Sequence, residues 1–238
     1  MNTKLFSAAV ITTMFSLLPL QSQAQTAARD DANNPVYAHG YGSGQNGGTG
    51  FDAFKVVATG TAGTFVFTAT ESEGNRGVPS PSTIDTGKKS FGLFAQRPGA
   101  SVTITRNFKI PLAAKGDMFS LDFVGGYNEA GMSGVALTNG DGTVGSFVFH
   151  SGGVGVLFNG APTGVGFVPG ASHLVYTLTS PTSYSLTVTG AGAYTGSGTF
   201  SNPITGFQVQ QTDSGAITPN HNAYFNNLSV RYVSHEVP

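Results

Sequence analysis

Residues 173–189 read HLVYTLTSPTSYSLTVT, and they contain two runs in which every second residue is apolar. Alternation with a period of two over about 4–8 residues is the pattern of a strand that is buried on one face. Between the runs, Ser180-Pro181-Thr182 has the residue types of a tight turn. The stretch therefore predicts a β-hairpin. Its alternating apolar residues are Leu174, Tyr176 and Leu178, then Tyr184, Leu186 and Val188.

The same period recurs along most of the chain. It is found at residues 64–70, 101–110, 118–124 and 224–233. In residues 101–110, Val102, Ile104, Phe108 and Ile110 share one face, and Arg106 is the single interruption. No window places apolar residues at helical spacing over three turns. Roughly a dozen strands separated by turns predict an all-β chain, a two-layer antiparallel β-sandwich (jelly roll) with no helix beyond a signal peptide.

Composition agrees with a sandwich and excludes several classes of protein. The 238 residues include 34 Gly and 18 Phe but no Trp, and only 10% are charged. We expect Phe to fill the inner faces, with Thr and Ser on the outer faces. The absence of Cys excludes disulfides, thiolate metal sites and a cysteine nucleophile. A net charge of −1 excludes the basic surface that nucleic-acid binding requires.

The first 24 residues have the pattern of a secretory signal peptide. Lys4 precedes an apolar run over residues 5–20, and Ser22-Gln23-Ala24 is a small-x-small site that predicts cleavage after Ala24. The polar residues 25–34 predict a flexible lead-in, followed by a single β-sandwich domain over residues 35–238. No later segment is long and apolar enough to span a membrane. We therefore expect a secreted protein, extracellular or at the cell surface, with the periplasm as an alternative.

The last predicted strand carries a resemblance to known modules. Residues 223–230, AYFNNLSV, resemble the closing strand of jelly-roll modules of the concanavalin-A-like and carbohydrate-binding kinds. Residues 47–51 and 89–95 look like parts of uncharacterised, secreted, Gly-rich bacterial proteins. The resemblance implies a jelly roll over residues 35–234 and a role that faces glycans. Many sugar-binding modules stack the sugar on Trp, so any stacking platform in this chain would be Tyr or Phe.

Motifs of familiar catalytic sites are missing. The chain has no Glu-x-Asp-x-x-Glu run, no Gly-x-Ser-x-Gly elbow before a helix, and no His-Glu-x-x-His. Asp122 lies between Leu121 and Phe123, and its parity places it on the solvent face beside Ser120. The sequence therefore predicts that the chain is not an enzyme.

Two small groups of residues are candidate sites. Tyr127 and Asn128 follow a Gly-Gly turn and would contact a glycan from a loop. Asn139 and Asp141 could bind calcium, together with Asn128 or Glu129, because calcium accepts carboxylate and amide oxygens. The favoured interpretation of Asn139-Gly140-Asp141-Gly142 is a hairpin turn, because Asn-Gly and Asp-Gly are common in hairpins. Apart from calcium, the sequence indicates no cofactor.

Three functions fit these observations, in order of preference. The first is a secreted, non-catalytic module that binds a polysaccharide or a cell-surface glycan. The second is a structural protein of the cell envelope or biofilm matrix that associates with itself through strand edges. The third is an enzyme that acts on polysaccharides through an unrecognised site.

Overall fold

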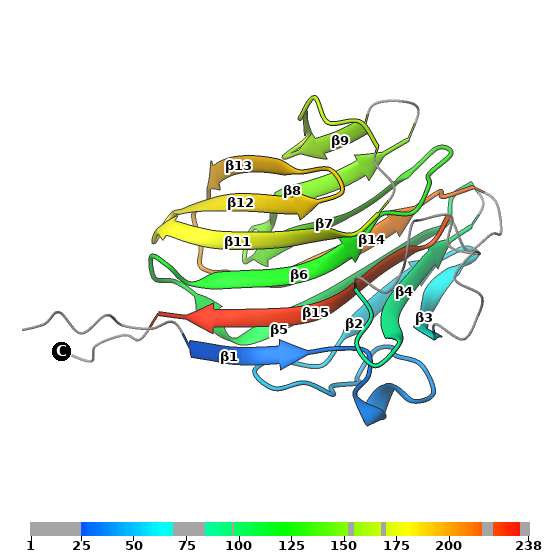
Figure 1. The fold of residues 1–238 in the computed structure, drawn as a ribbon, viewed down its shortest axis with the longest axis horizontal. Helices are drawn as coiled ribbons and strands as arrows, with labels where there is room; N and C mark the ends of the chain where they lie inside the picture. The colour runs from blue at the N-terminus through cyan, green and yellow to red at the C-terminus, as the bar shows by residue number, and fades with distance from the viewer. Residues whose placement is uncertain are drawn as a thin grey trace, which may run out of the picture.

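We analysed a computed structural model, which describes residues 25–68, 84–96, 98–151, 155–167, 170–215 and 221–233. These residues form two antiparallel sheets, of eight and seven strands, that pack face to face (Figure 1). The predicted all-β sandwich is confirmed, with fifteen strands in the described residues rather than about a dozen. The predicted signal peptide lies outside the described residues.

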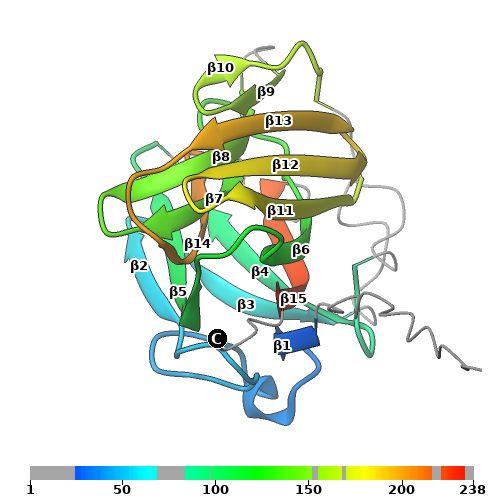
Figure 2. The same ribbon diagram turned by 90° about the vertical axis from the view of Figure 1, so that its left-hand side faces the viewer.

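The first sheet runs in the order β13-β12-β11-β6-β15-β4-β3, and β1 also pairs with β15. Figures 1 and 2 both place β13 above and β1 below in this sheet. The bounds are β13 Tyr194–Thr199, β12 Ser183–Gly190, β11 Ser172–Ser180, β6 Met118–Val124, β15 Ala223–Tyr232, β4 Lys89–Ala95, β3 Ala62–Thr68 and β1 Gln25–Asp30.

The second sheet runs in the order β10-β9-β8-β7-β14-β5-β2. The chain crosses between the sheets at each step from β4 to β7, which ties the two layers together. The bounds are β10 Ala161–Pro162, β9 Gly155–Phe158, β8 Gly142–His150, β7 Met132–Asn139, β14 Ile204–Thr212, β5 Ser101–Leu112 and β2 Lys55–Thr59.

Both predicted hairpin turns are confirmed. Asn139 pairs with Gly142 at the β7–β8 turn, and Ser180 pairs with Ser183 at the β11–β12 turn. The 3-10 turn η1 (Pro35–Tyr37) is a helical element that the sequence did not predict. No helix in the described part of the chain has the length and apolar character needed to cross a membrane.

Phenylalanine fills the space between the sheets, as the composition predicts. Phe119 and Phe123 of β6 face Phe207 and Phe149 of the opposite sheet, with ring centroids 4.8 Å and 5.9 Å apart. All four are buried. Phe67 of β3 differs, because it packs in a second cluster with Val124, Tyr224 and Ile84, apart from this core. Some of the Phe therefore lies outside the main core.

The strand over residues 101–112 departs from the predicted face near its end. Val102, Ile104 and Phe108 are buried, but Ile110 is 59% exposed. The pairing of β14 with β5 shifts register between Ile204 and Gly206, so the alternation is broken near this point. The prediction that Ile110 shares the buried face is therefore wrong.

Arg106, the one polar residue on that face, is fully buried. Its guanidinium donates to Asp30 Oδ2 at 2.6 Å and to Asn46 Oδ1 at 2.6 Å. It also lies over the rings of Phe51 and Phe54, 4.7 Å and 4.2 Å from their centroids. A buried cation is tolerated because a carboxylate and aromatic faces surround it.

The prediction of a flexible lead-in over residues 25–34 is wrong. Gln25–Asp30 forms β1, which pairs with β15, and Asp30 is the buried partner of Arg106. Ala28 and Ala32 belong to the core, and Asn34 accepts a hydrogen bond from the Val36 N–H at the start of η1. Long-range pairing orders this polar segment, and local composition does not report such pairing.

The Asn226-Asn227 pair in the closing strand joins several segments. Asn226 is buried; its amide accepts from Ala32 N and donates to Ile84 O and Lys89 O. Asn227, at a φ of 54°, donates to Asp122 Oδ2 at 2.6 Å. These bonds hold the segment after β1, the start of β4 and its preceding segment, and β6 around β15, so the motif that carries the resemblance has a structural role.

Candidate functional site

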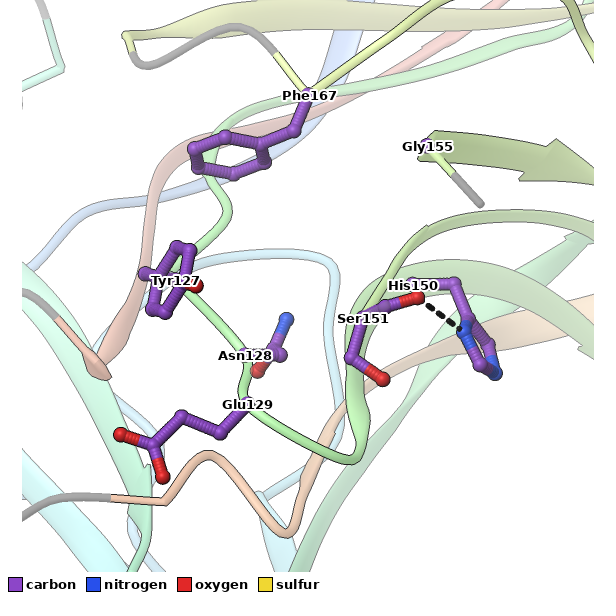
Figure 3. Close-up of a pocket in the computed structure, with 7 residues that line it drawn as sticks. All are labelled: Tyr127, Asn128, Glu129, His150, Ser151, Gly155 and Phe167. Atoms are coloured by element: carbon purple, nitrogen blue, oxygen red, sulfur yellow. Dashed lines mark hydrogen bonds between the residues drawn. The ribbon is translucent and has the colours of Figure 1, made fainter. Parts of the chain in front are cut away.

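A cavity of about 290 Å³ opens among the loops at the end of the sandwich where β6 and β8 end and β7 and β9 begin (Figure 3). This is the right-hand end in Figure 1. Three of the lining residues come from the β6–β7 loop. The lining is Tyr127, Asn128, Glu129, His150, Ser151, Gly155 and Phe167.

An aromatic pair forms one side of the cavity. Tyr127 is 54% exposed and Phe167 is 37% exposed, and their ring centroids lie 6.4 Å apart at an interplanar angle of 80°. Phe149 supports Phe167 from behind, with centroids 6.0 Å apart. Exposed aromatic rings that are held by other rings offer a rigid apolar surface to a ligand.

Asn128 lies beside this pair but is buried. Its Nδ2 is within hydrogen-bonding distance of Gly126 O, Ser133 Oγ and Phe149 O, at 3.1, 3.2 and 3.4 Å. Its Oδ1 has no hydrogen-bond partner in the described structure. The amide therefore fixes the loop that carries Tyr127, and it leaves one acceptor unsatisfied beside the cavity.

Glu129 is the one carboxylate among the described lining residues, and a buried histidine lies next to it. The Glu129 Oε1 atom is 3.9 Å from Nε2 of His221, and the Glu129 side chain is 53% exposed. His221 Nδ1 contacts the Ser214 carbonyl, which can only accept, so Nδ1 carries the proton. In the neutral imidazole, Nε2 then presents its lone pair toward Glu129. Tyr127 packs edge-on against the same ring, 5.3 Å away.

Close backbone packing fixes these loops. A Cβ on Gly131 would lie 1.9 Å from the Thr212 carbonyl oxygen. A Cβ on Gly215, which has a φ of +95°, would lie 2.3 Å from the carboxyl group of Glu129. Glycine at these two positions allows the β6–β7 loop to approach the end of β14 and Glu129 to lie over residue 215.

The two residues predicted to contact a glycan, Tyr127 and Asn128, line the same cavity. Tyr127 presents its ring there, whereas Asn128 uses its Nδ2 within the chain. Sequence reasoning missed Phe167 and His221, and it considered Glu129 only as a calcium ligand. The two missed residues lie in segments without strand alternation, so no periodic signal marks them.

The candidate calcium residues lie elsewhere. Asn139 and Asp141 are at the far end of the β7–β8 hairpin, so the prediction that Asn128 or Glu129 joins them is wrong. Asn139 Oδ1 accepts from the Asp141 N–H at 2.9 Å, as in a turn. Asp141 Oδ2 accepts from Ser201 and Asn202, and these bonds, the Ser201 hydroxyl first, lower the pKa of Asp141. Calcium binding by this pair stays a prediction.

Among the described residues, no group of three or more His, Asp or Glu side chains lies close enough together to bind a metal ion. Asp122 lies on the outer face, as predicted, but it is only 16% exposed. Its Oδ1 is 2.6 Å from Nδ1 of His173, and its Oδ2 accepts from Asn227. Asp122 thus links β6, β11 and β15.

No family model and no curated protein matches the chain. Among solved structures, it is similar to a carbohydrate esterase from the Shiga toxin-encoding bacteriophage phi24B (TM-score 0.50, 15% identity), over 89% of this chain and 100% of that one. A protein of unknown function from Shewanella oneidensis MR-1 matches with a TM-score of 0.48 and 14% identity, over 95% and 100% of the two chains. The enzymatically active domain of a bacteriophage CBA120 tailspike protein matches with a TM-score of 0.34 and 18% identity, over 74% of this chain and 19% of that one.

The first of these structures corrects the expectation that the chain is not an enzyme. That expectation came from the absence of familiar motifs, yet a protein described as an esterase has the same fold over its whole length. At 15% identity the likeness concerns the fold, and function has to be argued from the site. The absence of a known motif therefore does not exclude catalysis on this sandwich.

Proposed function

We propose that the chain is a carbohydrate-acting hydrolase that binds one glycosyl unit in the cavity and cleaves an acyl ester on it. The observation that carries this proposal is the combination, in one cavity, of the exposed Tyr127–Phe167 pair with the Glu129 carboxylate and its buried histidine neighbour. A polysaccharide partner also agrees with the predicted export of the chain. Self-association stays a prediction.

The aromatic pair provides the binding surface. The apolar C–H face of a sugar ring packs on an aromatic ring, and the hydroxyl groups at its edge need polar partners. Tyr127 provides such a ring, and Ser151 and Glu129 lie around the same cavity. A volume of about 290 Å³ suits a single sugar rather than a longer segment.

Ester hydrolysis fits the ionisable groups better than glycoside hydrolysis. Glycosidases use two carboxylates about 5–10 Å apart, and Glu129 is the only carboxylate in the described lining. Hydrolysis of an ester needs one base to activate water. The proposal gains support from the fold neighbour that is described as a carbohydrate esterase.

In the proposed step, the Glu129 carboxylate takes a proton from water while the water oxygen bonds to the ester carbonyl carbon. The carbon–oxygen bond to the sugar then breaks, and the sugar oxygen receives the proton from Glu129. The products are a carboxylic acid and a free sugar hydroxyl. Nε2 of His221 lies 3.9 Å from the carboxylate, beyond hydrogen-bonding distance, so neither proton transfer is assigned to it.

The test is the release of acid from a panel of acylated polysaccharides. We expect Glu129→Gln to lose about 10²–10⁴-fold in turnover while it still binds the polysaccharide. Tyr127→Ala should weaken binding, and Tyr127→Phe should keep it, because the ring provides the contact. Asp52→Asn, at an exposed acid in another loop, is the matched control. Full turnover by Glu129→Gln would refute the assigned role.

A further inference from the structure

We infer that the cavity selects an uncharged glycosyl unit and rejects uronic, sialic and sulfated sugars, with Glu129 as the residue that sets the preference. This inference rests on the proposed function, because it names the class of substrate for the same cavity. It is carried by the distribution of charge around the cavity rather than by the catalytic step.

No Lys or Arg is found among the described residues that line the cavity. Glu129 is the one acid among them. Glu129 is half exposed at the cavity, so the fixed charge that a bound sugar meets is negative.

Anionic sugars need the opposite arrangement. Carboxylate and sulfate groups are usually recognised by Arg or Lys through charge-assisted hydrogen bonds. The described residues at the cavity offer two histidines instead, and both contact other parts of the chain. Nδ1 of His150 lies 3.1 Å from the Ser151 carbonyl (Figure 3), and His221 is buried beneath Tyr127 and Glu129. Among the described residues, an anionic sugar would therefore approach Glu129 without a Lys or Arg to pair with it.

Uncharged sugars meet no such penalty. Their hydroxyl groups can donate to the Glu129 carboxylate, and their apolar faces can pack on Tyr127. The chain's low overall charge, 11 basic and 12 acidic residues, adds little long-range field of either sign. The preference should therefore arise locally, and added salt should screen it over about 10 Å at 0.1 M.

One basic residue needs a separate arm of the test. Gln96 pairs with Gly215, over which Glu129 lies, and the next residue, Arg97, is outside the described residues. If Arg97 provided an anion site, its removal would weaken the binding of anionic sugars specifically. The inference expects Arg97→Ala to leave the order of preference unchanged.

The experiment compares matched pairs of oligosaccharides, such as galactose against galacturonic acid oligomers and glucose-based against glucuronic acid oligomers of one linkage. Binding is measured by calorimetry at low and high salt, for the wild type, Glu129→Gln, Glu129→Lys, Arg97→Ala and the control Asp52→Asn. We expect the wild type to bind a neutral member about tenfold more tightly than its acidic partner at low salt, with a smaller ratio at high salt. The ratio should shrink in Glu129→Gln and reverse in Glu129→Lys.

Three results would overturn the inference: equal or tighter binding of the acidic members by the wild type, an unchanged ratio in Glu129→Gln, or loss of acidic-sugar binding in Arg97→Ala. Absence of binding by both members of every pair would remove the inference together with the sugar-binding half of the proposed function. A clear neutral preference without any release of acid would support the inference and refute only the ester hydrolysis.

Discussion

Removal of the Asp30 side chain should destabilise the whole sandwich, although Asp30 lies in a polar segment near the start of the described chain. Its carboxylate is buried and accepts from Arg106 Nη1 at 2.6 Å and from the Tyr37 hydroxyl at 2.5 Å. Burial, and next the hydrogen bond to Asp30, raise the pKa of Tyr37 well above its ordinary value, so the phenol stays a donor. Asp30→Ala would leave both donors without this acceptor in the core.

The magnitude follows from these two bonds. Hydrogen bonds to a charged group contribute about 1.5–3 kcal/mol each, so two of them give about 3–6 kcal/mol. Breaking a buried ion pair by removing one partner costs about 3–5 kcal/mol, because the other charge stays buried and uncompensated. We therefore expect Asp30→Ala to lower the free energy of unfolding by about 3–5 kcal/mol. Most domains have about 5–15 kcal/mol in total, so the loss is large.

The assay is equilibrium unfolding in guanidinium chloride, followed by circular dichroism because the chain has no Trp. Asp31→Ala is the matched control, since Asp31 is the neighbouring acid and its Oδ1 accepts from the Asn33 N–H in an exposed turn. This variant should cost about 0.5–1.5 kcal/mol. Combining Asp30→Ala with Arg106→Met should cost less than the sum of the two single changes, by about 2–3 kcal/mol.

A cost below about 1 kcal/mol for Asp30→Ala would refute the reasoning, because it would mean that the buried guanidinium does not need its partner. Strict additivity in the cycle with Arg106→Met would refute it as well. An equal loss in Asp30→Ala and Asp31→Ala would show that the two acids act only through the local turn. In each case β1 would be a weakly attached strand rather than part of the core.

Two further predictions concern backbone packing and pH. Gly131→Ala should lower the free energy of unfolding by more than about 2 kcal/mol, because its Cβ would lie 1.9 Å from the Thr212 carbonyl oxygen. The control Gly140→Ala has open space around its Cβ and should unfold within about 0.5 kcal/mol of the wild type. Thermal unfolding measures both variants, and equal costs would contradict the prediction. The hydrogen bond to Asp122 raises the pKa of His173 above 6.5, so its stabilisation should be complete below pH 6.5 and decline as pH rises through the raised pKa. Because the His173 side chain is half exposed, we expect His173→Gln to cost about 0.5 kcal/mol near pH 5.5 and less near pH 8. A cost independent of pH would contradict the assignment.

Period-two alternation predicted the two layers, because a strand with one buried face has apolar residues at every second position. Both hairpin turns were predicted from the types of their turn residues. Arg106 shows where this information ends. Its parity places it on the inner face, and nothing nearby in the sequence identifies its partner, which lies 76 residues away in a segment predicted to be flexible. Pairing over such a distance depends on the fold and leaves no periodic signal.

The candidate site was only partly predictable for the same reason. Tyr127 could be predicted because it follows a Gly-Gly turn, and this local sequence pattern indicates an exposed aromatic residue. Phe167, between β10 and β11, and His221, just before β15, join it only because the fold brings them against the β6–β7 loop. A search for one compact motif could not find a group drawn from separate loops, so the missing motif was weak evidence against catalysis. The informative question is which side chains the strand ends bring together, and here they are an aromatic pair, one acid and one buried imidazole.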